Sequence, residues 1–386
     1  MSSLSSTVRT RTAHRSGECG ECITLRPYIG AMTLAATEDR QGLSPVQWAV
    51  RGLTPGYFAL VMASGIISVG LNLIGQTWLS MALLVIAIAA FLLLVVLTAW
   101  RLIAYRSEVV SDFQDARRAF GFFTLIAGTN VVGVRLAMAG HPRLTGGLLV
   151  VAALLWFVLG YVIPWTAVLG PHPRPIIAAA NGTWFIWVVA SQSVAISAAT
   201  LERVYDSARA VLAIVAVFSW SVGVFLYAAA GVFVAARMML YEFRPIDLNP
   251  PYWVAMGASA ITVLAGARIV EMDNAPMVDA TRGLIAGASV LFWAFATWLI
   301  PALVAAGWWR HFHHKVPLTY EATLWSIIFP LGMYAVAGIY LGQADHLPIV
   351  GAIGGAWIWL ALAAWALTLV TMVRHLFRTV ILAPRG

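Results

Sequence analysis

Long apolar stretches recur along the whole chain and are separated by short polar segments. A helix needs about 20 consecutive, mostly apolar residues to cross the hydrocarbon core of a bilayer. The pattern predicts ten such helices, at 53–73, 77–104, 119–139, 145–170, 176–200, 208–238, 250–271, 281–308, 320–342 and 348–372. The predicted fold is therefore all-α and polytopic.

The ten apolar runs alternate in character. The odd-numbered runs contain many Gly, Ser, Thr and Pro residues, whereas the even-numbered runs are smoother, as in the Leu-, Ile-, Val- and Ala-rich segment 81–98. Smooth apolar helices suit contact with lipid, and helices with small and polar residues suit close packing or a water-filled path. We expect the odd-numbered helices inside and the even-numbered helices around them.

Composition supports a membrane domain and argues against a soluble one. Of the 386 residues, 61% are hydrophobic and 10% are charged, against about 25% charged residues in soluble proteins. The net charge of +8 could suggest nucleic acid, but the basic residues lie in loops, so we expect no nucleic-acid partner. The predicted organisation is a polar, disordered cytoplasmic tail (1–50), a ten-helix transport domain (51–375) and a short cytoplasmic C-terminal tail (376–386).

The charges in the loops predict the orientation, because cytoplasmic loops carry an excess of Lys and Arg. The basic residues on one side of the membrane are Arg51, Arg101, Arg106, Arg117, Arg118, Arg174, Arg237, Arg244, Arg310, Lys315, Arg374 and Arg378. The connections on the other side are very short or acidic, with Glu202, Asp206, Glu271, Asp273, Asp279 and Asp345. We therefore predict a multi-pass protein of the plasma membrane with both termini in the cytoplasm.

A local pattern recurs in four of the odd-numbered runs. Two adjacent aromatic residues are followed, five and six positions after the second, by a small residue and then by Ser or Thr. The four pairs of small and hydroxyl residues are Ala63 and Ser64, Gly128 and Thr129, Ala190 and Ser191, and Ala258 and Ser259. A chain this rich in aromatic residues can produce such matches by chance, but one match per odd-numbered run favours a repeat of five helical hairpins.

The ninth run breaks the pattern. Counted from Trp325, its equivalent positions are Pro330 and Leu331, and Phe329 stands beside them. If five odd-numbered helices face a common axis, four offer a small residue and a hydroxyl at one level. The fifth offers a proline kink and a benzyl group. The four pairs are therefore candidate pore-lining residues.

Few ionisable residues fall within the predicted spans. Arg135 and Arg268 lie near the outer ends of odd-numbered helices, and Glu271 is placed to pair with Arg268 on one helix face. A paired or snorkelling end residue is one interpretation of each arginine. A positive outer mouth that attracts anions is the other. No Asp or Glu lies in the middle of a span, which argues against proton-coupled and cation-coupled mechanisms.

Other candidate chemistry is weak. Cys19 and Cys22 form a CxxC that can be a redox pair or half a zinc site, but no second pair exists, and a start at Met32 would remove both. His311, His313 and His314 can bind a metal, although a hydrated basic loop is the preferred interpretation. No GxSxG, HExxH or P-loop pattern occurs. We expect no enzyme activity, no cofactor and no metal.

Three segments resemble the tellurite-resistance/dicarboxylate transporter family, which includes plant slow anion channels, bacterial tellurite-resistance permeases and fungal malate and sulfite transporters. They are Pro-Gly-Tyr-Phe at 55–58 running into Met-Ala-Ser-Gly at 62–65, Pro-Pro-Tyr-Trp at 250–253 running into Gly-Ala-Ser at 257–259, and Trp-Ser-Ile-Ile-Phe-Pro at 325–330. Their order across ten spans, over roughly residues 50–375, makes the resemblance specific.

The resemblance implies five helical hairpins around a quasi-fivefold central pore, with the odd-numbered helices lining one pore in each subunit of a homotrimer. It also implies that a phenylalanine of the ninth helix plugs the pore, and Phe329 beside Pro330 matches that position. The long phosphorylated tails of the plant channels have no counterpart in this sequence, so their gating is not transferred.

Three functional hypotheses follow. The leading one is a passive or weakly coupled conduit for small inorganic or organic anions, gated by Phe329. The second is a secondary transporter, with proton coupling as one form, for C4-dicarboxylates, sulfite or tellurite-type oxyanions, which would depend on Arg135, Arg268 or a histidine. The third is an intramembrane enzyme or cofactor-binding subunit, which lacks the paired mid-span residues that it would need.

Overall fold

The computed structural model describes residues 43–170, 174–273 and 275–381. The Cys19 and Cys22 pair, most of the predicted N-terminal tail and the last residues of the C-terminal tail lie outside the described residues. The chain divides into two units at Trp48 and Ala49, and the second unit contains all of the long apolar helices. A short helix, α2 (Pro45–Arg51), stands at the division.

The prediction of ten membrane spans is confirmed: ten helices in the described part of the chain are long and apolar enough to cross a bilayer. The inner helices are α3 (Ala59–Leu73), α6 (Phe123–Met138), α8 (Phe185–Glu202), α10 (Val254–Val270) and α12 (Trp325–Ala344). The outer helices are α4 (Thr77–Ala104), α7 (Pro142–Leu169), α9 (Arg209–Leu240), α11 (Pro276–Trp308) and α13 (Pro348–Leu376). A surface helix, α5 (Arg106–Gln114), joins the first hairpin to the second.

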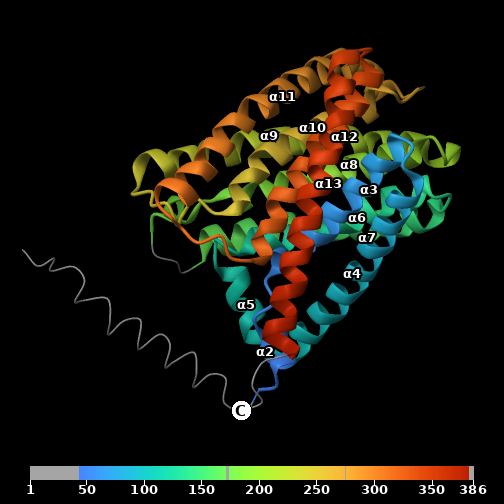
Figure 1. Ribbon diagram of the computed structural model, residues 1–386. Helices are drawn as coiled ribbons and strands as arrows, with labels where there is room; N and C mark the ends of the chain where they lie inside the picture. Colours follow the sequence, from blue (N-terminus) through green and yellow to red (C-terminus); the bar gives the residue numbers. More distant parts are fainter. Residues whose placement is uncertain (1–42, 171–173, 274, 382–386) are drawn as a thin grey trace, which may run out of the picture. The chain divides into compact units, whose positions relative to one another are not determined.

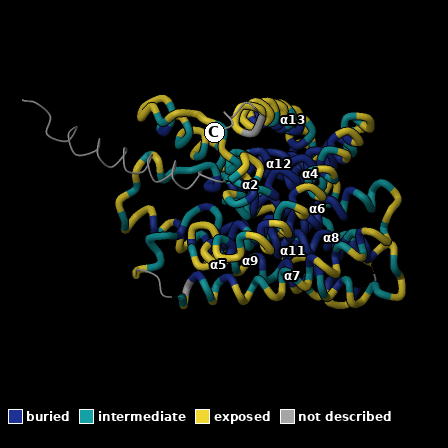
Figure 2. Tube along the Cα trace, turned by 90° about the horizontal axis from the view of Figure 1, so that it is seen from below, coloured by how far each residue is buried: buried dark blue, intermediate teal, exposed yellow. Residues whose placement is uncertain are grey.

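Inner and outer helices differ sharply in burial. In the most apolar stretch of each span, 78–89% of the residues of inner helices are buried, against 6–33% for outer helices. Figure 2 shows the buried segments gathered in the middle of the view and the exposed segments around them. The expected division into inner and outer helices is therefore confirmed.

Every inner span begins with a single 3₁₀ turn. These turns are η1 (Pro55–Phe58), η2 (Ala119–Phe122), η4 (Gly182–Trp184), η6 (Pro250–Trp253) and η8 (Ala322–Leu324). The aromatic pair of the sequence repeat lies at the change from 3₁₀ turn to α-helix, and the fifth span keeps the turn although it has lost the pair. The run predicted at 176–200, which corresponds to α8, starts later than predicted because Ile176–Ala179 forms a separate turn, η3. The Asn181 side chain then caps η4 by accepting from the Thr183 amide at 2.8 Å.

The inner helices contact one another in a closed cycle. α3 contacts α6, α6 contacts α8, α8 contacts α10, α10 contacts α12, and α12 returns to α3. Each outer helix packs on the inner helix of its own hairpin, and Figure 1 shows α13 running beside α12. This cycle of contacts agrees with five hairpins around one axis, while a fivefold pore along that axis stays a prediction.

Short turns join the two helices of each hairpin. In two of them a glycine with positive φ ends the inner helix: Gly75 (φ 80°) and Gly140 (φ 87°). The Gln76 amide then donates to the Leu71 carbonyl at 2.8 Å, which satisfies a carbonyl at the helix end, as in a Schellman motif. We call this end of the molecule the hairpin end, and the opposite end, where one hairpin connects to the next, the linker end. The loop charges predict that the linker end is cytoplasmic.

Glycines allow the closest helix contact, between α12 and α13. A methyl group at Gly354 would lie 2.5 Å from the Ala335 carbonyl oxygen, and one at Gly342 would lie 2.6 Å from the Gly351 backbone. No side chain fits between the two backbones. Small residues at such interfaces let membrane helices gain van der Waals contact, because lipid provides no hydrophobic force between helices.

Three outer helices carry an arginine at the linker end that holds the segment preceding their inner partner. Arg101 Nε donates to the Arg51 carbonyl at 3.0 Å, and Arg237 Nε donates to the Ala178 carbonyl at 2.8 Å. Arg310 donates through Nη1 to the Leu248 carbonyl. The equivalent contacts support the repeat of hairpins that the sequence pattern indicated.

Candidate functional site

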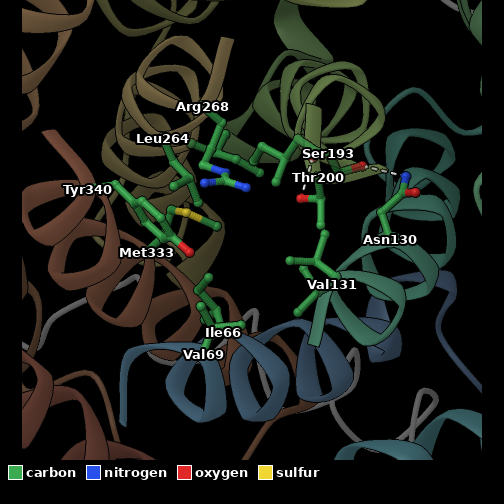
Figure 3. Close-up of a pocket in the computed structure, with 13 residues that line it drawn as sticks. Ile66, Val69, Asn130, Val131, Ser193, Thr200, Leu264, Arg268, Met333 and Tyr340 are labelled. Carbon is green, nitrogen blue, oxygen red and sulfur yellow. Dashed lines mark hydrogen bonds between the residues drawn. The ribbon is translucent and has the colours of Figure 1, made fainter. Parts of the chain in front are cut away.

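All five inner helices line a narrow cavity toward the hairpin end (Figure 3). Its volume is about 30 Å³, which suffices for one or two water molecules, since each needs roughly 10–15 Å³ by this measure. The lining residues are Ile66, Val69, Asn130, Val131, Val134, Ser193, Ile196, Thr200, Ile261, Leu264, Arg268, Met333 and Tyr340. The cavity therefore lies where the cycle of inner helices encloses space.

Arg268 is the charged residue of this lining. Figure 3 shows its guanidinium group reaching into the cavity from α10, with Thr200 of α8 on the opposite side. Arg268 Nη1 donates to Glu271 Oε2 at 2.9 Å, and the guanidinium carbon lies 5.2 Å from the centre of the Tyr340 ring. The predicted Arg268–Glu271 pair is present, and the arginine still faces the cavity.

Two arginines share the Glu271 carboxylate beside the cavity. Arg203 Nη2 lies 3.3 Å from the same Glu271 Oε2 that pairs with Arg268, so the three residues carry a net charge of +1. Beyond α12, burial raises the pKa of Asp345, and the charge of His346 offsets part of this rise. Asp345 therefore loses its negative charge at a higher pH than an ordinary aspartate. Acidic residues such as Glu202, which pairs with Arg209, also lie at this end. Among the residues that line the cavity, however, Arg268 is the charged one, so the cavity itself favours an anion.

Arg135, the second predicted mouth residue, is placed differently. It is 1% exposed and does not line the cavity. Its guanidinium donates to Ser68 Oγ at 3.0 Å and to Ser80 Oγ at 2.8 Å. Each of these hydroxyls in turn donates to the other serine's carbonyl at 2.6 Å, which ties α3 to α4. No carboxylate lies within ion-pair distance of Arg135 in the described part of the chain, so its charge adds to the positive potential of this end.

Phe329 lies on the cavity-facing stripe of α12. It precedes Met333 by four residues and Tyr340 by eleven, and both of those residues line the cavity. Residues four apart on a helix lie on one face, about one turn from each other. The Phe329 side chain is 1% exposed and does not line the cavity itself. Its position on the helix is one turn beyond the cavity, toward the linker end.

Pro330 fixes α12 against α10. A methyl group at Gly257 would lie 2.8 Å from Pro330 Cγ, so the proline ring occupies the space that the missing side chain leaves. Proline also removes one backbone donor, so the Ser326 carbonyl has no amide partner four residues on. The backbone beside Phe329 thus packs against α10 through Pro330 and lacks one helical hydrogen bond at the same residue.

The small members of the four predicted pairs occupy equivalent places on the other inner helices. Ala63, Gly128, Ala190 and Ala258 each precede a cavity-lining residue by three positions, these being Ile66, Val131, Ser193 and Ile261. All four are buried. By helical spacing they lie about one turn beyond the cavity. On α12 the residue three positions before the lining residue Met333 is Pro330, and Phe329 is one position further toward the linker end. The small residues of the other four helices therefore stand about level with the Phe329–Pro330 pair.

The hydroxyl members of the same pairs are hydrogen-bonded elsewhere. Ser64 Oγ accepts from Trp365 Nε1 of α13 at 2.9 Å, and Ser191 Oγ accepts from Trp156 Nε1 of α7 at 2.8 Å. Ser259 Oγ donates to the Phe292 carbonyl of α11 at 2.8 Å, and Thr129 Oγ1 donates within α6. Three of the four hydroxyls thus hold an outer helix, and we do not carry them into the proposed path.

The sequence pattern missed several cavity residues, among them Thr200, Tyr340 and Asn130. Asn130 Nδ2 donates to Ser193 Oγ at 3.0 Å, whereas its Oδ1 is buried with no partner among the described residues. Because buried acceptors are nearly always satisfied, a water molecule in the cavity would suit this atom. Thr200 and Tyr340 each follow another lining residue, Ser193 and Met333, by seven positions, which places each pair on one helix face. The sequence contains this spacing, but only the structure shows which face of each helix lines the cavity.

The histidine cluster lies at the linker end, away from the cavity. His311 Nδ1 lies 2.8 Å from the Val316 carbonyl oxygen, and the rings of His313 and His314 are 4.8 Å apart. Within the described ranges, no group of three or more His, Cys, Asp or Glu residues is arranged to hold a metal ion.

Several known proteins are similar to this chain. An uncharacterized membrane protein of Mycobacterium tuberculosis is 64% identical over 156 residues, which cover 40% of this chain and 79% of that protein. Two uncharacterized transporters of Methanocaldococcus jannaschii align over almost the whole membrane domain. One is 23% identical over 85% of this chain and 94% of its own length, and the other is 22% identical over 86% and 97%.

A family model with the description "voltage-dependent anion channel" matches residues 52–373. The match begins just before the first inner helix and ends within the last outer helix, so it covers the ten-helix domain. The resemblance drawn from the three sequence segments is thereby confirmed. The chain belongs to the SLAC1 family of voltage-dependent anion channels, which are membrane transporters and channels with anions as substrates.

Proposed function

We propose that the chain conducts small anions across the membrane through the ring of inner helices, past the side chain of Phe329. The path runs from the hairpin end through the cavity that Arg268 faces, and then between Phe329 and the four small residues at its level. In the closed state that we propose, Phe329 plugs this path. The protein is then an anion channel or permease, not an enzyme.

One observation carries the proposal: Phe329 lies on the cavity-facing stripe of α12, one turn beyond Met333, and at about that level the other four helices have the small residues Ala63, Gly128, Ala190 and Ala258. A ring of small residues leaves space at the axis, and a single benzyl group is of a size to fill it.

Charge supports an anion as the substrate. No Asp or Glu is among the residues that line the cavity, whereas Arg268 is. A cation or proton path usually needs an intramembrane carboxylate. Selectivity would come from the width of the path and the local positive potential, without a tightly binding charged ligand at the narrowest point.

Opening requires Phe329 to leave the axis. Pro330 removes one helical hydrogen bond from α12 and packs on Gly257 of α10, so a bend of α12 would form next to the plug. A rotation of the Phe329 side chain, or a small movement of α12 at this bend, would join the cavity to the linker end.

The test is anion flux into liposomes that contain purified protein. Phe329→Ala should raise chloride and nitrate flux about tenfold or more, because lowering a barrier by only about 1.4 kcal/mol gives tenfold. The matched control is Phe185→Ala. Phe185 is a buried phenylalanine of the inner helix α8, but its ring lies 5.3 Å from Tyr227 of the outer helix α9. Unchanged flux in folded Phe329→Ala protein would refute the gate, and so would an equal rise in both variants.

A coupled transporter for C4-dicarboxylates, sulfite or tellurite-type oxyanions is the alternative within the same family. Uptake by a proton-coupled carrier would saturate and follow an imposed pH gradient, whereas flux through a conduit would follow the anion gradient alone. The same liposomes, with and without a pH gradient, distinguish the two mechanisms. The absence of a carboxylate from the cavity lining favours the conduit.

The proposal includes an assembly and an orientation. Each subunit of a homotrimer would hold its own path, because the five inner helices of one chain already close the cycle around the cavity. The linker end would face the cytoplasm of a cell whose plasma membrane contains the protein, with both termini on that side. Cross-linking in native membranes and labelling of single cysteines at each end would test these two points.

A further inference from the structure

A second pocket lies at the linker end, among the start of α10, the end of α11 and the start of α12. Its volume is about 190 Å³, several times that of the ring cavity, and the two share no lining residue. Much of its wall is apolar, with Trp253, Leu303 and Leu324 among the contributors, and Arg310 lies in the same wall. The pocket is thus amphipathic and separate from the proposed anion path.

Arg310 differs from its two counterparts in the repeat. Arg101 has a carboxylate partner, with Nη1 2.7 Å from Asp112 Oδ2, and Arg237 fills its Nε and Nη1 with backbone carbonyls. Arg310 is 7% exposed, and its Nε is buried without a hydrogen-bond partner in the described part of the chain. No described carboxylate lies within ion-pair distance of it. A buried guanidinium with unused donors is unfavourable unless a ligand supplies acceptors.

The surroundings of Arg310 are basic. His311, His313, His314 and Lys315 follow it directly in sequence. His311 lines the pocket beside Arg310, and its Nδ1 lies 2.8 Å from the Val316 carbonyl oxygen. Across the pocket stands the Glu321 carboxylate, which is exposed and accepts from Thr323 Oγ1 at 3.1 Å. Arg310 and Glu321 balance each other in formal charge within the lining, and Lys315 in the adjoining loop makes the neighbourhood net positive.

Exposed apolar residues are adjacent in sequence to residues that line the pocket, with Trp308 following Gly307 and Phe312 following His311. Trp308 is 59% exposed, Phe312 is 73% exposed and Leu318, which also lines the pocket, is 75% exposed. Aromatic residues at the end of an apolar helix mark the boundary between hydrocarbon and headgroups. Basic pockets between membrane helices on the cytoplasmic side bind the headgroups of anionic lipids. The exposed apolar rim offers a surface along which acyl chains can lie.

We propose that this pocket binds the phosphate group of an anionic phospholipid from the leaflet at the linker end. The phosphate oxygens accept from Arg310, and the acyl chains pack against the apolar rim formed by Trp308, Phe312 and Leu318. The bound lipid joins the segment before α10 to the ends of α11 and α12, and so stabilises the hairpin next to the helix that carries Phe329.

Gly307 provides a way to close the pocket without disturbing the fold. It lines the pocket, and a methyl group built on it would meet no atom within 4 Å. Gly307→Leu therefore places a side chain in open space at a helical position. Gly287→Leu is the matched control, because Gly287 belongs to the same helix, has the same open space and does not line the pocket.

The experiment measures lipid bound to purified protein in neutral detergent, by native mass spectrometry and by the shift in Tm. Phosphatidylglycerol should bind and raise the Tm of the unaltered protein and of Gly287→Leu, whereas phosphatidylcholine should not. Gly307→Leu should bind phosphatidylglycerol at least about tenfold more weakly. Equal binding by both glycine variants would overturn the proposal, and a Tm shift of the same size with inorganic phosphate alone would replace the lipid with a free anion.

A second pair of variants keeps the test decisive if Gly307→Leu does not fold. Leu318→Glu adds a negative charge to the exposed rim, and Leu318→Gln has nearly the same shape without the charge. Phosphatidylglycerol binding should be weakened by Leu318→Glu and retained by Leu318→Gln. Equal binding by the two would refute a phosphate at this pocket. None of these results depends on anion flux.

Discussion

The inner and outer helices of this protein are long enough to cross the same membrane but are opposite in construction. An inner helix such as α3 is buried along nearly its whole length and contains Gly, Ser and Ala, whereas its partner α4 is smoother and largely exposed. Between helices in lipid, close van der Waals contact and hydrogen bonds replace the hydrophobic effect. The comparison teaches that in this molecule polarity marks the interior, the reverse of a soluble protein.

Substitutions of large apolar residues should show this difference most strongly. Ile67→Ala on α3 removes a side chain with 0% exposure and should lower the free energy of unfolding by about 2–5 kcal/mol. Leu92→Ala on α4, where the side chain is 58% exposed, should change it by no more than about 0.5 kcal/mol. Thermal and denaturant unfolding in one detergent would measure both, and equal losses would break the comparison.

Two neighbouring glycines of α13 sharpen the comparison within one outer helix. Gly354→Ala places a methyl group 2.5 Å from the Ala335 carbonyl oxygen of α12 and should destabilise by about 1–3 kcal/mol. Gly355→Ala meets nothing within 4 Å and should stabilise by up to about 1 kcal/mol through helix propensity. If both variants shift the Tm in the same direction, the inward and outward faces of α13 have been assigned wrongly.

The charges at the cavity should act on flux in opposite directions. Arg268→Gln removes the positive group that faces the cavity and should lower anion flux about fivefold, the factor given by roughly 1 kcal/mol of attraction. Glu271→Gln frees Arg203 and Arg268 from their shared carboxylate and should raise flux by a similar factor. Both effects should shrink in high salt, because salt screens exposed charges. Parallel changes in the two variants would argue against an electrostatic role.

The tryptophan–serine contacts should have the smallest effect. Trp365→Phe and Trp156→Phe each remove one hydrogen bond from an outer helix to an inner serine and should destabilise by about 0.5–1.5 kcal/mol. Anion flux per folded molecule should not change, since both hydroxyls face away from the cavity. A large change in flux with little change in Tm would return Ser64 or Ser191 to the lining of the path.

Much of the fold could be predicted because the membrane simplifies the problem. Ten apolar runs specify ten helices, and the contrast between smooth and polar runs such as α4 and α3 specifies which helices lie inside. The sequence pattern also set α12 apart as the one inner helix to break the repeat, and the family resemblance then pointed to Phe329 beside Pro330. Its position on the cavity stripe agrees with that hypothesis, while gating itself stays a prediction.

The orientation of individual side chains could not be predicted in the same way. Adjacent residues such as Ala63 and Ser64 differ by about 100° around a helix, so both cannot face the axis, and the sequence does not reveal which one does. Arg135 and Arg268 look alike in sequence, yet one is enclosed by Ser68 and Ser80 and the other faces the cavity. The rotation of each helix about its own axis determines which side chains face the cavity. That rotation depends on how the five inner helices pack together.

The most direct test of the anion path compares Ala63 with its neighbour Ser64. In a Phe329→Ala background with Cys19 and Cys22 changed to serine, Ala63→Cys places a thiol at the axis, and Ser64→Cys places one against Trp365 of α13. A small anionic thiol reagent added at the hairpin end should block anion flux through the Ala63→Cys protein and leave the Ser64→Cys protein unaffected. Block of both, of neither, or of the Ser64 variant alone would contradict a path through the ring of inner helices past Phe329.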